Sequence, residues 1–458
     1  MEYLVSQNVK VISHLNYGAP VIKGDNWGYM INMLRQCLIN GFNERTDISE
    51  LKVIDENTIN ITFLSPHNYQ IEQTIAITGA PLADLNTEFI IRSINGLIIT
   101  CDTYIPLSNI IGQELLALSG VSSKVAPLGF IEEYSLNNKS VFRPNEVDKN
   151  CYLCVDDDMP TGWDNTKNIL PLVFMTDKMS DINTVIGKFI VPYDSTTPNR
   201  YKEKIYGSTK TGMWHWPSFF LIGNPTNTVE QQGQIVEWSI VGNDKFFYII
   251  ARYQSYYEIT TRCFYFGKFK SLIPNDTGNY ILLADSYIGT NDLLISYNGS
   301  SGIGPTNSTL MYNKLSYNNV NNMTPSAILK DSFNRKPIQP ILLPIVSAQI
   351  KSNIFVSGIA NNLINNTVLL QYPEKYTNKF KLSKVQIAEN TYIRGIMPGL
   401  LWQQTLGPYM NMTITRHKYN NKLVRLFQFT VTSMFIDMYS TSVNASYSIS
   451  LSNDDWSL

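Results

Sequence analysis

The chain has 458 residues, a net charge of −1 at pH 7 and a charged fraction of 16%, which is well below the roughly 25% of typical soluble proteins. Its Lys and Arg residues are scattered and form no stripe that would neutralise a run of phosphates, so nucleic acid is not an expected partner. The N-terminus lacks a basic segment followed by an apolar run, and no apolar stretch approaches the ~20 residues of a membrane span. We therefore expect an unprocessed protein with no membrane span.

The residue types favour strands over long helices. The 27 Tyr and 20 Phe residues stand beside many Ile, Val and Thr residues, and such side chains pack well on a pleated surface. We expect a mainly β fold of several β-sandwich or barrel-like units with one notable N-terminal helix.

The clearest helix signal lies in residues 24–42. Apolar residues recur there at helical spacing, Asp25 and Asn26 can cap its start, and Gly41 can end it. We assign residues 1–48 to an N-terminal arm and this helix.

Short alternating runs follow and predict a small β domain over residues 49–118. The runs are residues 58–63, 74–77, 89–91 and 97–99, with turns at residues 79–81 and 95–96. A linker is expected at residues 119–127.

A central β domain is predicted for residues 119–296, with strands at residues 151–155, 235–241 and 246–251 and a hairpin turn at residues 242–244. The Asn-, Gly- and Ser-rich segment that follows predicts an exposed loop or junction over residues 297–336. Strands resume in a C-terminal β domain, residues 337–458, where two glycines and a proline predict a tight turn at residues 394–402. Candidate packing surfaces are residues 25–40, 426–436 and 442–451.

Histidine and cysteine residues give no complete metal or catalytic pattern. His14, His67, His215 and His417 lack partners at a ligand spacing, so we expect packing or hydrogen-bonding roles. Cys151 and Cys154 have a C-x-x-C spacing but sit in a strand-like run, where their sulfurs would point to opposite faces, and an odd total of five cysteines argues against a disulfide framework. We expect buried thiols and no disulfide; a metal role is the alternative.

Two further clusters have a functional and a structural interpretation. The carboxylates of Asp156, Asp157, Asp158 and Asp164 could bind a hard cation such as Ca²⁺, but a solvated turn at the end of a strand is the preferred interpretation. Trp214 and Trp216 could stack a sugar or a base, although a core or interface anchor is preferred. No local nucleophile, phosphate-binding or zinc-protease motif occurs, and paired carboxylates distant in sequence stay possible. We therefore expect no enzyme and no catalytic, cofactor-binding or metal residues.

Short segments spread across most of the chain form one pattern. The segments are His14-x-x-Tyr17-Gly18-Ala19-Pro20, Gly24, Gly28, residues 34–42, Ile77-Thr78-Gly79-Ala80, Leu85-Asn86, residues 152–157, Trp216-Pro217, residues 238–248, Phe266-Gly267 and residues 394–400. Together they resemble a family of tailed-bacteriophage virion structural proteins that are associated with tails and baseplates. One departure is Thr87, which stands where the family usually has Gly.

This resemblance implies a structural subunit of the virion tail or baseplate, such as a ring, collar or connecting protein. It would be made in the host cytoplasm and would assemble with other tail or baseplate proteins, as a homo-oligomer in a symmetric ring. One alternative is a receptor- or carbohydrate-binding tail tip protein that uses Trp214, Trp216 and residues 298–322. A second is a tail-associated glycosidase, and a head–neck or decoration protein is a variant in location.

Overall fold

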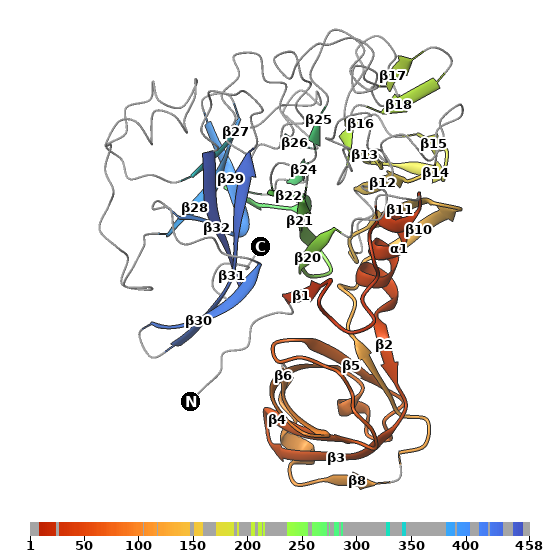
Figure 1. The fold of residues 1–458 in the computed structure, drawn as a ribbon, viewed down its shortest axis with the longest axis vertical. Helices are drawn as coiled ribbons and strands as arrows, with labels where there is room; N and C mark the ends of the chain where they lie inside the picture. The colour runs from red at the N-terminus through yellow and green to blue at the C-terminus, as the bar shows by residue number, and fades with distance from the viewer. Residues whose placement is uncertain are drawn as a thin grey trace.

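The structure is a computed structural model in which strands far outnumber helices among the described residues, so the fold is mainly β as predicted. Figure 1 shows a small barrel at one end and a larger group of sheets at the other, here called the body. The described residues are 9–23, 27–103, 105–116, 118–146, 151–158, 171–186, 190–191, 203–206, 209–212, 214–215, 236–254, 259–272, 274, 279–283, 285–286, 327–329, 341–344, 382–389, 392–403, 412–419, 422–433 and 443–451.

The barrel is an eight-stranded antiparallel sheet that curls around its own core (Figure 1). Side chains at alternate positions point inward, among them Ile59, Ile61 and Phe63 of β4, and this follows the period of two that the sequence shows. In spatial order the strands are β2 (Phe42–Arg45), β9 (Ser122–Val125), β5 (Thr74–Thr78), β6 (Glu88–Asn95), β7 (Ile98–Thr103), β4 (Thr58–Phe63), β3 (Ile48–Asp55) and β8 (Glu114–Leu116), with short 3-10 turns η2 (Ala83–Leu85) and η3 (Ser108–Ile110).

The barrel sheet is longer than residues 49–118, because β2 and β9 both belong to it. The expected linker at residues 119–127 is therefore wrong: Ser122–Val125 is strand β9, paired with β2 and β5. Gly120 lies in the turn before this short strand and Pro127 comes two residues after it, and together they made the whole segment look like a loop.

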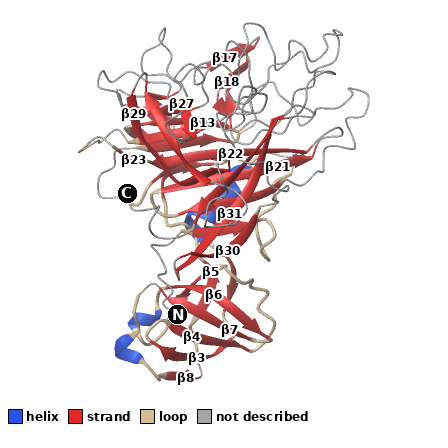
Figure 2. Cartoon of the chain, turned by 90° about the vertical axis from the view of Figure 1, so that its left-hand side faces the viewer, coloured by secondary structure: helices blue, strands red, loops and turns tan. Residues whose placement is uncertain are grey.

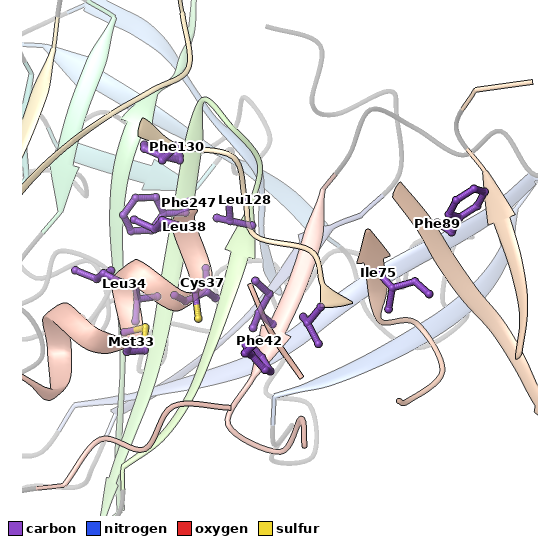
Figure 3. Packing of buried hydrophobic residues seen from close by; sticks show 14 of the residues in the cluster. Met33, Leu34, Cys37, Leu38, Phe42, Ile75, Phe89, Leu128, Phe130 and Phe247 are labelled. Carbon is purple, nitrogen blue, oxygen red and sulfur yellow. The ribbon is translucent and has the colours of Figure 1, made fainter. Parts of the chain in front are cut away.

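The predicted helix is confirmed. It consists of α1 (Tyr29–Arg35) followed without a break by a π-helical turn, η1 (Gln36–Asn40), and it ends at Gly41, whose φ of 73° is left-handed. Met33, Leu34, Cys37 and Leu38 are fully buried and form its apolar face (Figure 3). Asp25 and Asn26, the expected caps, lie outside the described residues.

A central sheet forms the middle layer of the body and is buried on both faces. Trp238, Ile240 and Phe247 share one core with the helix, whereas Val241 and Tyr248 belong to a second core on the opposite face. This explains the nearly continuous apolar runs between residues 236 and 266, because a strand with two buried faces needs no polar alternation. The strands, in order, are β1 (Lys10–Ser13), β20 (Glu237–Gly242), β21 (Phe246–Gln254), β22 (Ile259–Lys268), β24 (Tyr280–Leu283) and β26 (Ala327–Leu329).

The flanking sheet lies on the helix side of the central sheet and shares its core through Phe142, Leu153 and Met175. Two hairpins accompany it, β14 (Met179–Asp181) with β15 (Thr184–Val185) and β17 (Glu203–Tyr206) with β18 (Thr209–Gly212). Its strands are β10 (Ile131–Leu136), β11 (Lys139–Arg143), β12 (Tyr152–Asp156), β13 (Leu172–Thr176), β19 (Trp214–His215) and β25 (Asp285–Ser286), with β16 (Ile190–Val191) paired to β13.

The C-terminal sheet covers the other face of the central sheet through Leu400, Phe429 and Ile449. Figure 1 shows the layers side by side, and in Figure 2 the C-terminal sheet faces the viewer. Its order is β27 (Ile341–Pro344), β28 (Leu382–Glu389), β29 (Tyr392–Gln403), β32 (Val443–Ser450), β31 (Lys422–Ser433) and β30 (Thr413–Tyr419), with β23 (Lys270–Ser271) paired to β29.

The tight turn expected at residues 394–402 is wrong, because this segment lies inside the twelve-residue strand β29. Its glycines serve other purposes. A Cβ added at Gly395 would meet the Phe269 ring at 2.5 Å, and Gly399 has a φ of 60° next to irregular pairing with β28. The carbonyl of Pro398 accepts a hydrogen bond from the buried Tyr248 hydroxyl at 2.8 Å. The segment therefore locks the C-terminal sheet onto the central sheet.

Candidate functional site: the junction of barrel, helix and body

The polar contacts between distant parts of the chain concentrate where the barrel joins the body. The segment that leaves the barrel ends the helix: Leu128 N–H donates to the Cys37 carbonyl at 2.8 Å, and Gly129 N–H donates to the Leu38 carbonyl at 3.0 Å. These bonds satisfy carbonyls that a helix end otherwise leaves without a donor. Phe130 then packs edge-on against Phe247 of the central sheet (Figure 3).

Gly41 makes a close crossing of the two chain segments possible. A Cβ added at Gly41 would overlap the carbonyl oxygen of Val125, so the segment that enters the barrel and the one that leaves it touch backbone to backbone. Leu38 and Phe42 on one side and Leu128 on the other make the apolar core continuous through this crossing (Figure 3). The barrel is therefore held by packing as well as by covalent connection.

Lys10 of β1 is a buried cation at this junction. Its ammonium forms an ion pair with Glu88 of the barrel strand β6 and donates to the Pro127 carbonyl. Burial lowers the pKa of Lys10, and the charge of Glu88 opposes that shift. A buried ion pair adds little net stability, but an arrangement that left either charge buried alone would be costly, so this contact favours the observed position of β6 against β1.

A second ionic contact joins the barrel to the C-terminal sheet. Glu72 binds the guanidinium groups of Arg416 and Arg425, and Arg416 Nε donates to its carboxylate at 2.6 Å. Glu72 has a φ of 73°, an uncommon conformation for a residue with a side chain. These residues lie more than 340 positions apart in the sequence, so the pairing could not be predicted from spacing.

The start of the helix is capped by a carboxylate from the flanking sheet. Asp157 Oδ2 accepts hydrogen bonds from the backbone N–H groups of Met30 at 2.9 Å and Ile31 at 3.5 Å. Asp157 is only 1% exposed, so the solvated turn expected for the Asp cluster is wrong at this residue.

The other members of the Asp cluster make different contacts. The Asp156 carboxylate pairs with Lys139 at 3.5 Å, and the Asp158 carboxylate accepts a hydrogen bond from the Asn138 N–H at 3.3 Å. Asp164 lies outside the described residues.

Burial raises the pKa of Asp157 to about 8, against the opposing effect of the helix N–H donors. The ordinary pKa of an Asp is about 3.9, so between roughly pH 4 and pH 8 the folded chain keeps a proton that the unfolded chain releases. The contribution of this group to stability is complete below about pH 4 and falls as pH rises toward 8, at up to about 1.4 kcal/mol per pH unit.

Asp157→Asn removes this titration, so the pH dependence of the melting temperature between pH 5 and pH 8 should be flatter than in the wild type. Thermal melting followed by circular dichroism across that range measures both curves. Parallel curves for the two proteins would show that Asp157 does not titrate there.

His14 and His67 make the packing and hydrogen-bonding contacts that were expected of them. Trp238 N–H donates to His14 Nδ1 at 3.1 Å, and Tyr69 N–H donates to His67 Nδ1 at 3.0 Å. His215 lies in β19 and His417 in β30, each opposite a residue of a neighbouring strand.

The five cysteines are buried free thiols. Cys151 belongs to the core beneath the central sheet and Cys154 to a cluster on the opposite face of the flanking sheet, so the C-x-x-C pair is split between two faces. Burial raises the pKa of Cys154 well above its ordinary value, which favours an inert thiol over a thiolate. Within the described ranges, no group of three or more His, Cys, Asp or Glu side chains is placed to hold a metal ion.

Of the aromatic cluster, Trp214 lies in β19, which pairs with β13 and β25, and Trp216 falls outside the described residues.

None of the described helices is long and apolar enough to cross a membrane. Comparison with models of known protein families and with curated protein sequences finds no match to this chain.

Proposed function

We propose that this chain is a structural subunit of a tailed-phage virion, in the tail or baseplate, which acts by assembling with other proteins. The supporting observation is the place of the segments that resemble virion proteins. They occupy close contacts of the fold: the Trp238 indole donates to the Pro20 carbonyl at 3.2 Å, and Gly79 lies directly against the Gly120 carbonyl.

The resembling segments later in the chain also occupy close contacts of the fold. Gly242 and Gly267 both lie against Phe246, and Gly395 lies against Phe269. The segments that carry the resemblance therefore maintain the close packing of the fold, and this supports the proposed structural role. As part of the same proposal the chain is not an enzyme, since its described buried acids and thiols are engaged in caps, ion pairs and cores.

Mass spectrometry of purified, salt-washed particles tests this proposal. We expect the chain in a fixed ratio to the other particle proteins, and in the tail fraction when heads and tails are separated. Recovery in the head fraction would favour the head–neck variant. Absence from the washed particles would contradict the proposal, and cleavage of host cell wall by the purified chain would favour the glycosidase.

A further inference from the structure

The near-neutral net charge of the chain conceals two regions of opposite sign. Residues 42–125, which form the barrel, contain ten Asp and Glu residues and four Lys and Arg residues. The whole chain has 37 acidic and 36 basic residues, so the rest has 27 and 32. The barrel therefore carries a net charge of −6 and the remainder +5. Such an asymmetry orients the association of charged surfaces.

Part of the acidic charge of the barrel is already neutralised within the chain. Asp47, Asp102 and Glu114 pair with basic residues of the barrel, whereas Glu72 and Glu88 pair with basic residues of the body. Four exposed carboxylates have no basic partner in the described part of the chain: Glu44, Asp55, Glu56 and Asp84.

Two of these carboxylates lie at the hairpin between β3 and β4, where Asp55 is the last residue of β3 and Glu56 begins the turn. Figure 1 shows β3 on the lower side of the barrel, away from the body. The loop between β7 and β8 is bound to this hairpin, because Leu107 N–H donates to the Glu56 carbonyl at 2.7 Å and Gly112 N–H donates to the Val53 carbonyl at 3.0 Å. Turn and loop therefore make one surface.

This surface exposes large apolar side chains. Ile54, Ile105 and Ile111 are 45%, 57% and 52% exposed, respectively. We call Ile54, Asp55, Glu56, Ile105 and Ile111 the tip patch. An exposed apolar group with a charged rim is typical of a protein interaction site.

We propose that the tip patch binds the basic body of a second copy of this chain, head to tail; this rests on the proposed function. The charges still favour this partner after the ion pairs of Glu72 and Glu88 with Lys10, Arg416 and Arg425 are set aside, because the barrel then keeps −4 and the rest of the chain +2. A contact of tip with tip would instead bring Asp55 and Glu56 of two copies together. A head-to-tail contact uses two different surfaces, so repeating it builds a ring when the rotation closes.

The test measures the mass of the purified full-length chain by light scattering and mass photometry at low and high salt. The wild type should form oligomers that weaken as salt rises. Ile105→Asp with Ile111→Asp should weaken association at least tenfold, and Asp55→Lys with Glu56→Lys should weaken it at low salt. Leu64→Asp and Asp84→Lys change an exposed apolar and an exposed acidic residue of the barrel outside the tip patch, and they should associate as the wild type does.

Mixing a tip variant with the wild-type chain distinguishes a head-to-tail contact from a contact of tip with tip. A tip variant keeps its body, so in a head-to-tail assembly it still accepts the barrel of a wild-type copy and enters mixed oligomers, which it then terminates. Exclusion of the variant from mixed oligomers would mean that two tips meet, and it would overturn the proposal. So would tip variants that assemble normally, or a wild type that is monomeric at every concentration. Recovery of the chain from washed particles judges the proposed function separately.

Discussion

Replacing Trp238 by Ala should lower the free energy of unfolding of the body by about 3–5 kcal/mol, the range for removing a large aromatic side chain from a core. Trp238 is fully buried in β20, where its indole belongs to the core shared with the helix. The substitution leaves a cavity in the middle layer of the fold and removes the donor that satisfies the Pro20 carbonyl. It should therefore also loosen residues 14–20 from the central sheet.

Urea denaturation followed by tryptophan fluorescence and by circular dichroism measures this loss. Trp238→Phe is the matched control, because it keeps most of the apolar volume and removes only the indole donor. It should cost clearly less than the Ala variant. A cost below about 1 kcal/mol for Trp238→Ala would mean that the core collapses around the missing ring and that this packing is not decisive.

Gly79→Ala should destabilise the barrel by about 2–4 kcal/mol, through a left-handed backbone and an overlap that has no room to relax. Gly79 has a φ of 77°, and an added Cβ would overlap the carbonyl oxygen of Gly120 in the turn before β9. The obstacle is backbone, so relief would require β5 and β9 to separate.

Gly112→Ala isolates the contribution of the backbone conformation. Gly112 has the same φ of 77°, but nothing lies within 4 Å of its added Cβ, so the expected cost is about 1 kcal/mol. Urea titrations of both variants give the difference. Equal losses would show that conformation alone makes glycine necessary at position 79, and that the close approach to Gly120 contributes nothing.

The sequence pattern predicted the strands and the helix that have one buried face and one face exposed to water. Strand β4 matches the predicted run at residues 58–63, and the helix lies where its apolar spacing placed it. Residues 246–251 were also predicted as strand, but the nearly continuous apolar run did not show that this strand would be buried between two other sheets.

The prediction of turns from Gly and Pro was less successful, because these residues also occur inside strands. Gly395 permits a close approach within a long strand, which the sequence alone does not distinguish from a turn. The junction was also not predictable. Asp157 caps a helix 127 positions earlier, and nothing local to residues 156–158 indicates that partner.

The pairing of β1 with β20 bears on the order in which the protein can fold as it is synthesised. Lys10 lies opposite Gly242, 232 positions later, and at about 5–20 residues per second the ribosome takes roughly 10–50 s to make that partner. The described strand pairs of the barrel all join residues between 42 and 125, so the barrel can close first. A chain released before residue 242 would thus carry a finished barrel beside an N-terminal strand without its partner, and that is the form that chaperones and proteases would encounter.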